Sequence, residues 1–465
     1  MFKTEIYVKR REKLRELVKT GVGLFLGNDT VPMNYPANTY PHFRQDSSFL
    51  YYFGLDEPGL AAIIDFDEGK EILFGTDVGI EEIIWMGYLP PLKEKAEKIG
   101  VKEISPPNKL EEFLKNALEK GRKIHYLPPY RGEHLVKLFN LLGIKPEEAG
   151  KKASVELIKA VVEMRSVKQP EEIEEIEKAM EITNEMHLLA METAKPGMYE
   201  REIAGAMEGF VIQKGSYLSF PIICTIHGEI LHNTSQENEL KEGQLLLVDA
   251  GAESPLHYAG DMTRTFPVGK KFSQKQKEIY SIVLKTQLTA IDAIKPGIMY
   301  KEIHLLAAKT IAQGLKELGL MKGDVEEAVA NGAHALFFPH GLGHMMGLDV
   351  HDMEGLGEDY VGYNHTVKRS DQFGLAYLRL AKELKPGYVL TVEPGIYFIP
   401  ALIDQWKAQK KHEAFINYNK VEEYKNFGGI RIEDDVLVTE DGHRVLGKYV
   451  PKEIDDVEAV RSKQV

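Results

Sequence analysis

Apolar and polar positions alternate along the first third of the chain in blocks that predict helices and strands in turn. Residues Glu5 to Thr20 follow helical spacing, and the apolar run Val22 to Leu26 after them has the pattern of a buried strand. Such an alternation is typical of an α/β domain in which helices cover a sheet. The further predicted strands are residues 61–66, 71–74 and 123–127, and the next predicted helix is residues 133–142.

The segment from Phe43 to Gly54 is polar at its start and aromatic afterwards. Because aromatic residues are enriched in strands, we interpret it as a turn that leads into a core strand. A substrate contact is the alternative interpretation.

A domain boundary is predicted near residues 160–172. The pattern from Ser154 to Met191 is helical and highly charged, and Pro170 stands at a predicted first helical turn. Two glutamates follow it directly, which favours the start of a helix at this proline. We therefore predict two domains, residues 1–165 and residues 166–465.

Two motifs recur in the second predicted domain. In the second pair Asp249 aligns with Glu393, so an acid keeps its place in both copies. A duplicated unit would put both acids at matching ends of two related strands that face a shared centre. The first pair is residues 195–203 and 295–303, and the second pair is residues 240–251 and 384–395.

A β-hairpin is predicted from Leu245 to Pro267. Two apolar runs flank the turn-rich residues 251–257, and each run carries an aspartate, Asp249 in one and Asp261 in the other. Two carboxylates held close together raise each other's pKa and destabilise the fold. The hairpin therefore indicates a cation between them.

Two histidines four residues apart frame the sequence from His340 to His344. The glycines between them cost a helix about 1 kcal/mol each, so a tight loop is expected, feeding a strand from Met346 to Val350. The spacing of a nucleotide-binding glycine loop fails at Met346. His351 follows at the end of the predicted strand.

Four acids and one histidine form a candidate metal site. Each acid alone is more often a surface or turn residue, and a lone histidine is more often structural. As a group they lie in or beside apolar strands, where an unpaired charge is costly. Oxygen-rich ligands favour Mn²⁺, with Co²⁺ or Zn²⁺ as alternatives, and two ions roughly 3.5–4 Å apart would use all the carboxylates. The candidate ligands are Asp249, Asp261, His344, Glu393 and Glu433, the last in the strand-like run 428–438.

Such a pair of ions would lower the pKa of a bridging water and polarise a carbonyl group. This is the chemistry of a hydrolase. We therefore expect a hydrolytic enzyme that carries two divalent metal ions.

Composition narrows the function classes. The chain has 465 residues and a net charge of −13, which argues against binding to nucleic acid or to an anionic membrane. It contains one cysteine, Cys224, which fits a reducing compartment. Neither a secretory signal nor an apolar run of the roughly 20 residues needed to span a bilayer is recognised. A cytoplasmic location is expected.

The ordered motifs VDAG, AGDMTRTF, HGLGHMMGLDVH, TVEPGIYF and GGIRIEDDVLV resemble the metal-dependent pita-bread peptidases. Within them the chain is most similar to the Xaa-Pro aminopeptidase (aminopeptidase P) and prolidase branch. Residues 35–65 also resemble the N-terminal domain of that branch. The resemblance implies an N-terminal α/β domain with a mixed sheet. It also implies a C-terminal pita-bread domain of duplicated α/β halves around a curved antiparallel sheet, with metals in its concavity.

The resemblance also implies a role for each ligand. Asp249 would bind one ion, and Asp261 would bridge both. His344 and Glu393 would bind the other ion, and Glu433 would bridge. Glu393 would in addition carry a proton from the attacking water to the leaving amine.

Five further residues match functional positions of the same branch. His232 would lie beside the substrate, and His340 and His351 would line the proline side of the pocket and stabilise the tetrahedral intermediate. Arg431 and Tyr397 would lie next to the metal carboxylates, with a purely structural role as the alternative. We expect His232, His340, His351 and Tyr397 to contribute to substrate binding.

The implied activity is that of an Xaa-Pro aminopeptidase, which uses a hydroxide bridging two metals to cleave the first bond of peptides with proline second. An Xaa-Pro dipeptidase (prolidase) is the alternative. A third interpretation is a binding module of the same fold without catalytic activity. The presence of all five ligands argues against it. The resemblance further implies a homo-oligomer, a dimer or tetramer, formed through the N-terminal domain.

The chain departs from the branch in three places. The interval between Asp249 and Asp261 is 12 residues (261 − 249), one longer than in the family. Residues 354–383 and 400–427 are predicted insertions, and the second is long enough for a helix near the rim of the site.

Overall fold

The computed structural model describes residues 1–463, which divide into two compact units. The first unit contains Met1–Arg165 together with Glu354–Tyr360, and the second contains Ser166–Met353 together with the residues from Val361 onward. Both units mix helices and strands, so the predicted α/β class is confirmed. Within the described residues, no helix is both long and apolar enough to cross a lipid bilayer.

The first unit is an α/β unit whose strands alternate with helices, as its hydrophobic pattern predicts. Its elements are α1 (Thr4–Val18), β1 (Val22–Leu26), β2 (Pro32–Tyr35), β3 (Asn38–Thr39), α2 (Ser47–Phe53), β4 (Ala61–Asp65), β5 (Lys70–Phe74), α3 (Ile80–Met86), α4 (Leu92–Lys98), β6 (Glu103–Ser105), α5 (Lys109–Glu119), β7 (Ile124–His125), α6 (Gly132–Leu142), α7 (Pro146–Lys152), α8 (Val155–Ser166) and the short η2 (Glu354–Leu356) and α14 (Glu358–Val361).

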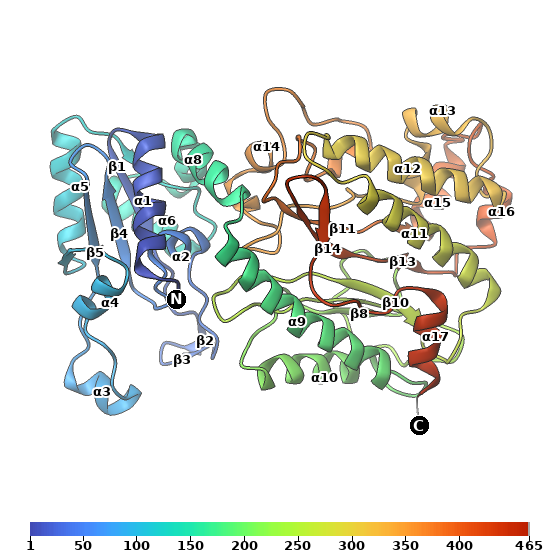
Figure 1. The fold of residues 1–465 in the computed structure, drawn as a ribbon, viewed down its shortest axis with the longest axis horizontal. Helices are drawn as coiled ribbons and strands as arrows, with labels where there is room; N and C mark the ends of the chain where they lie inside the picture. The colour runs from blue at the N-terminus through green and yellow to red at the C-terminus, as the bar shows by residue number, and fades with distance from the viewer. Residues whose placement is uncertain (464–465) are drawn as a thin grey trace. The chain divides into compact units, whose positions relative to one another are not determined.

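Five of these strands form one sheet in the order β6-β5-β4-β1-β7. The three central strands pair antiparallel, whereas β6 and β7 pair parallel at the two edges. The predicted mixed sheet is therefore confirmed. Helices α1, α5 and α6 run alongside the sheet (Figure 1).

The strand predicted within Phe43 to Gly54 is wrong, because Ser47–Phe53 forms helix α2. Asp46 caps the helix by accepting a hydrogen bond of 2.8 Å from the backbone N of Phe49. Gly54 ends it in the left-handed conformation at φ 64°. Every residue of α2 is buried, so the aromatic run reflects a helix buried on all sides rather than a strand.

The second unit begins with α9, whose first residue is the predicted Pro170. Figure 1 shows α9 and α10 on one side of its strands and α11 and α12 on the other. Its elements are α9 (Pro170–Thr193), α10 (Glu200–Gln213), β8 (Ile223–Thr225), β9 (Leu245–Asp249), β10 (Thr263–Pro267), α11 (Gln274–Asp292), α12 (Tyr300–Glu317), α13 (Val325–Ala330), η1 (Ala333–Leu336), η3 (Leu375–Tyr377), β11 (Val389–Val392), β12 (Gly395–Tyr397), α15 (Pro400–Ala408), α16 (Tyr418–Glu422), β13 (Gly429–Arg431), β14 (Asp434–Val438), β15 (His443–Val445) and α17 (Ile454–Ser462).

The predicted hairpin forms from β9 and β10, which pair antiparallel with Asp249 opposite Thr263. Every residue of both strands is buried, which is why the two runs are apolar without alternation. The other half has the matching pair β11 and β14, with Val392 opposite Asp434.

The repeated motifs take up the same conformation in both halves. Gly197 and Gly297 have φ 89° and 85°, and the turns before β9 and β11 place Gly243 and Gly387 both at φ 85°. Left-handed values of this kind favour glycine, which explains why the KPG-like turns repeat in the sequence. Each first-motif copy leads into a helix, α10 or α12.

The strand predicted from Met346 to Val350 does not form. The chain from His340 to Met346 instead runs beside β11 and makes one isolated bridge, between Met345 and Leu390. The backbone turns away after Met346, whose N still donates to Val389 O at 2.9 Å. The predicted helix in residues 400–427 does form, as α15.

Candidate active site

A cavity of about 580 Å³ opens in the second unit, and the structure brings nine of the ten candidate residues to its wall. The exception is Tyr397, which is fully buried behind it. The nine are His232, Asp249, Asp261, His340, His344, His351, Glu393, Arg431 and Glu433.

The five candidate ligands come from both halves of the unit. Asp249 ends β9, and Asp261 lies in the bend two residues before β10. Glu393 directly follows β11, and Glu433 lies between β13 and β14. The fifth, His344, lies beside β11 in the segment that was predicted to be a loop.

The close contact between this loop and β11 requires a glycine. The backbone N of Thr391 donates to His344 O at 3.0 Å, and the backbone N of His344 donates to Thr391 Oγ1 at 3.1 Å. A Cβ on Gly343 would stand 2.0 Å from Thr391 O. Gly343 therefore allows His344 to lie close to β11, the strand that Glu393 directly follows.

Three of the candidate ligands offer atoms to one point. Ligand atoms of Asp261, His344 and Glu433 all lie within 4.8 Å of one another, and all three residues are buried. His344 Nε2 also lies 3.6 Å from Glu393 Oε1.

The donor set fits metal ions. Asp249 Oδ1 and Asp261 Oδ1 are buried and make no hydrogen bond to any of residues 1–463, and such orphaned carboxylate oxygens are rare unless a ligand satisfies them. The Nδ1 atom of His344 is 3.1 Å from Met345 O and donates to it, so Nε2 is the ring nitrogen that would bind a metal. The residues present thus match what divalent ions need.

Burial and mutual repulsion raise the pKa values of three carboxyl groups in this site. Burial, with the negative charge of Asp249 adding to it, raises the pKa of Asp261 well above its usual value. Burial also raises the pKa of Glu393 to about 8, with Arg431 opposing and Asp261 adding to the effect. The pKa of Glu433 is likewise raised by burial and by Asp261.

Arg431 links the cluster to the residues behind it. Its guanidinium donates to Asp249 Oδ2 at 2.6 Å, to Tyr397 Oη at 2.9 Å and to Thr263 Oγ1 at 3.1 Å. Burial opposes its charge, but Tyr397 and Asp249 outweigh that cost, so the pKa of Arg431 lies well above its usual value.

Tyr397 connects Arg431 to His340. The Tyr397 hydroxyl lies 2.9 Å from His340 Nε2, and His340 Nδ1 lies 2.8 Å from Gly341 O. Burial, with the positive charge of Arg431 adding to it, lowers the pKa of His340 to about 3, so the ring is neutral at pH 7. Both its nitrogens are engaged within the protein, and its ring faces the cavity.

His232 is carried by a loop that a buried glutamate fastens. Glu200, the first residue of α10, accepts hydrogen bonds from Ile226 N at 2.8 Å and from Asn238 N at 3.1 Å. These two residues bracket the loop. In between, a Cβ on Gly228 would stand 2.5 Å from Gly429 O, so the loop packs against β13.

Several residues of the site escaped the sequence analysis. Arg379 lines the cavity, and Thr263 donates a hydrogen bond of 2.6 Å to Glu433 Oε2. Arg379 belongs to a predicted insertion, where motif spacing gives no signal. Thr263 lies inside the motif AGDMTRTF, but only the folded chain brings its hydroxyl to Glu433.

The two predicted insertions meet at the rim. The rings of Phe373 and Trp406 lie 5.7 Å apart between centroids. The same segments contribute apolar lining to the cavity. The apolar lining residues are Phe220, Pro221, Ile223, Leu231, Pro339, Val350, Phe373, Tyr377, Ile399 and Leu402.

Comparison with known proteins identifies the second unit. Residues 174–440, more than half of the chain, match the description metallopeptidase family M24. The chain belongs to metallopeptidase family M24. Residues 7–125 of this metallopeptidase also match the description aminopeptidase P, N-terminal domain. Membership of a metallopeptidase family implies divalent metal ions, in agreement with the orphaned carboxylate oxygens.

Curated relatives and solved structures cover nearly the whole of this M24 metallopeptidase. It is 33% identical to an Xaa-Pro dipeptidase of Rattus norvegicus over 461 residues, 96% of this chain and 91% of that protein. It is 33% identical to an Xaa-Pro aminopeptidase of Escherichia coli over 472 residues, 98% of this chain and 97% of that protein.

The solved structures agree in fold. A substrate complex of Escherichia coli aminopeptidase P is 32% identical, with a TM-score of 0.81, over 99% of this chain and 98% of that one. A zinc-substituted form with product has a TM-score of 0.82 at 32% identity over the same shares. The M24 fold of the second unit is thereby established.

Proposed function

We propose that this M24 metallopeptidase is an Xaa-Pro aminopeptidase, which releases the first residue of peptides with proline in second position. The observation that carries the proposal is one cavity that combines buried, orphaned carboxylate oxygens with apolar walls. Similarity to the Escherichia coli Xaa-Pro aminopeptidase over 98% of the chain supports it.

Two divalent ions would occupy the cluster described above. Mn²⁺ is favoured because four of the five side chains offer oxygen ligands, with Co²⁺ or Zn²⁺ as alternatives. When bound, such ions lower the pKa of a water molecule and polarise the carbonyl that it attacks. The proposed ligands are Asp249, Asp261, His344, Glu393 and Glu433.

The chain's own residues would move the protons and hold the substrate. Glu393 would take a proton from the attacking water and deliver it to the leaving proline nitrogen. His232 and His351 line the cavity and would donate to the substrate and to the developing oxyanion. His340 would present its ring, because Tyr397 and Gly341 engage its nitrogens. Arg431 would orient Asp249.

The cavity suits a bond to proline. A proline nitrogen lacks N–H, so a site for it needs apolar contact rather than a hydrogen-bond acceptor. Aromatic and aliphatic side chains such as Phe220, Phe373 and Ile399 supply that contact. The carboxylate cluster would attract the free α-amino group of the peptide.

An Xaa-Pro dipeptidase is the second candidate, and Arg379 favours it. Its guanidinium lines the cavity, and a dipeptide offers a free carboxylate to such a cation directly after the proline ring. Similarity to the rat Xaa-Pro dipeptidase supports this candidate at the same identity of 33%.

A substrate panel separates the two candidates. Purified protein with added Mn²⁺ is given Xaa-Pro dipeptides and Xaa-Pro-Xaa tripeptides that share their first residue. Turnover of tripeptides at a rate comparable to dipeptides supports the aminopeptidase. Cleavage of dipeptides only would refute it and establish the dipeptidase.

We also propose a homo-oligomer, a dimer or tetramer, formed through the first unit. Helix α3 has no buried residue, and its apolar side chains extend into solvent. A tryptophan exposed by 84%, Trp85, is unusual on a surface that stays free. Light scattering of Trp85→Glu against the natural chain would test this, with an unchanged mass contradicting it.

A cytoplasmic location is proposed as well. The chain has one cysteine, Cys224, which is buried and unpaired. A chain without disulfides is suited to a reducing compartment. Fractionation of cells that produce the protein tests this, and recovery outside the cytoplasm would contradict it.

A further inference from the structure

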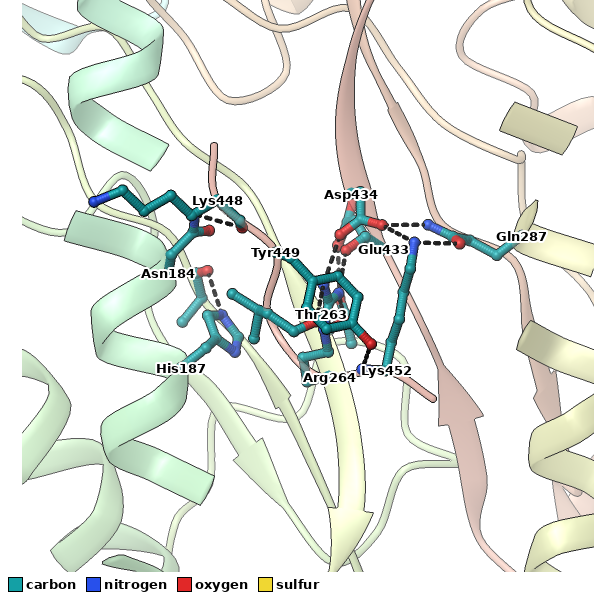
Figure 2. Close-up of polar contacts among 12 residues, drawn as sticks. Asn184, His187, Thr263, Arg264, Gln287, Glu433, Asp434, Lys448, Tyr449 and Lys452 are labelled. Carbon is teal, nitrogen blue, oxygen red and sulfur yellow. Dashed lines mark hydrogen bonds and ion pairs between the residues drawn. The ribbon is translucent and has the colours of Figure 1, made fainter. Parts of the chain in front are cut away.

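A buried arginine donates a hydrogen bond to the backbone carbonyl oxygen of Glu433, one of the proposed metal ligands. Arg264, on β10, is 1% exposed. Its Nη1 donates to Glu433 O at 2.6 Å and to Thr263 O at 3.0 Å, and its Nη2 pairs with Asp434 Oδ1 at 2.6 Å (Figure 2). The guanidinium thus links the backbone of β10 to Glu433 and Asp434, where the chain enters β14.

A second cation holds the far side of the same carboxylate. Lys452 Nζ lies 2.6 Å from Asp434 Oδ2, which also accepts from Gln287 Nε2 at 2.7 Å. Lys452 further donates to Gln287 Oε1 at 3.0 Å (Figure 2). Arg264 and Lys452 thus each pair with a different carboxylate oxygen of Asp434.

The chain that carries Lys452 is itself anchored. Asn184 Nδ2 on α9 donates to Lys448 O at 2.9 Å, and Arg264 Nη2 also donates to Val450 O at 3.3 Å (Figure 2). The segment from Lys448 to Lys452 is therefore held by α9 and by Arg264, and it belongs to the same hydrogen-bond network.

The network immobilises Glu433 at three points. Thr263 Oγ1 donates to its carboxylate at 2.6 Å, its backbone N donates to Thr263 O at 3.1 Å, and Arg264 binds its carbonyl oxygen. All three contacts come from two consecutive residues of β10, which begins two residues after Asp261. The positions of Glu433 and Asp261 are thereby coupled.

We propose that Arg264, held in place by Asp434 and Lys452, is a positioning residue that sets Glu433 against Asp261 for metal binding. The inference rests on the metal site proposed above. Stability alone gives little reason for this arrangement, since well-packed apolar residues often replace a buried ion pair without loss of stability. Residues that orient metal ligands, in contrast, typically change metal affinity 10–100-fold when altered.

The test compares Arg264→Lys with the matched control Arg461→Lys in the full chain. Arg461 is fully buried too, and within residues 1–463 it donates to carbonyl oxygens, none of which belongs to a proposed metal ligand, namely those of Met191, Ala194, Pro267, Val268 and Gly269. Chelator-treated protein is titrated with Mn²⁺ by calorimetry, and the absorption spectrum is recorded after loading with Co²⁺. Thermal unfolding of each metal-free variant is measured in parallel.

We expect Arg264→Lys to weaken Mn²⁺ binding at least tenfold and to shift the Co²⁺ spectrum. Arg461→Lys should lower the unfolding temperature but leave Mn²⁺ affinity within about threefold of the natural chain. Natural affinity and spectrum in Arg264→Lys, with a fall in unfolding temperature like that of the control, would overturn the proposal.

A second variant covers the case in which Arg264→Lys does not fold. Lys452→Met keeps the Arg264–Asp434 pair and removes only the cation on its far side, and weaker Mn²⁺ binding by a few-fold is expected. Natural affinity in that variant would then overturn the proposal. If the natural chain bound none of Mn²⁺, Co²⁺ or Zn²⁺, the metal site itself would be refuted, which is a distinct result.

Discussion

The Oδ2 atom of Asp261 lies 3.5 Å from the Nε2 atom of His344, and the two side chains come from opposite halves of the duplicated unit. Metal–ligand bonds of about 2.0–2.2 Å place two ligands of one ion about this far apart. Because His344 Nδ1 donates to Met345 O, the other ring nitrogen and the Asp261 carboxyl group can hold one cation between them, either a proton or a metal ion. A cation is the natural partner for both.

Metal binding should therefore release protons. The pKa of Glu393, about 8, means that this group holds a proton at pH 7 in the metal-free protein, which a bound ion would displace. The pKa values of Asp261 and Glu433 are raised in the same direction. Mn²⁺ affinity is expected to rise with pH up to about pH 8. Calorimetry in two buffers of different ionisation enthalpy measures the protons released, and no release at pH 6–7 would contradict this.

The same shift fixes the sign of the stability change. The folded pKa of Glu393, about 8, lies above the unfolded value of about 4.3. Its contribution to the free energy of unfolding is therefore complete below about pH 4.3 and is lost as the pH rises through about 8. The increase in unfolding temperature on adding Mn²⁺ should be larger at pH 8 than at pH 6. An equal increase at both would contradict the account.

Substitution of Glu393 should separate activity from folding. Glu393→Ala removes the proposed proton carrier and one metal ligand, and a general acid–base group alone contributes about 10²–10⁴-fold. We expect kcat to fall at least about a hundredfold while the circular dichroism spectrum stays that of the natural chain. Near-normal turnover would refute the assigned role.

Arg379 should matter more for dipeptides than for longer peptides. Loss of a charge-assisted hydrogen bond to the substrate carboxylate costs about 1.5–3 kcal/mol, so Arg379→Met should lower kcat/KM for Xaa-Pro dipeptides at least about tenfold. Tripeptides should lose less.

Lys407→Met is the control for this variant, since Lys407 pairs with Glu422 on the rim and does not line the cavity. It should leave both substrate classes unchanged. Equal losses for dipeptides and tripeptides in Arg379→Met would contradict the role in carboxylate binding.

The loop of His232 should depend on the charge of Glu200. Glu200→Gln weakens the bonds to Ile226 N and Asn238 N, so we expect KM to rise about tenfold with a smaller change in kcat. Glu202→Gln, which weakens only the exposed bond from Tyr199 N at the same helix start, is the control and should leave KM unchanged. The same rise in both variants would reduce Glu200 to a helix-capping role.

The sequence was sufficient for elements whose local signals agree. Pro170 begins α9, and the duplicated turns reappear with glycines at nearly the same φ. The aromatic run of α2 was misread because burial on every side erases the helical period. The strand predicted from Met346 to Val350 does not form because the backbone turns away from β11 after Met346.

Long-range contacts account for what the sequence did not reveal. The role proposed for Arg264 depends on its hydrogen bond to Glu433 O. The role of Glu200 depends on its hydrogen bonds to a loop that ends at Asn238. Such contacts join residues far apart in the chain, and the motifs that contain Arg264 and Glu433 do not show that the two residues are bonded. Arg379 was missed for the same reason, since only the folded chain brings it to the cavity.

The most direct test of the central claim is hydrolysis of an Xaa-Pro-Xaa tripeptide by chelator-treated protein before and after Mn²⁺ is added back, beside the matched Xaa-Ala-Xaa peptide. The account predicts no release of the first residue without metal, restored release with Mn²⁺, and little cleavage of the alanine peptide. Absence of turnover with Mn²⁺, Co²⁺ and Zn²⁺ alike, or equal cleavage of both peptides with metal, would contradict it.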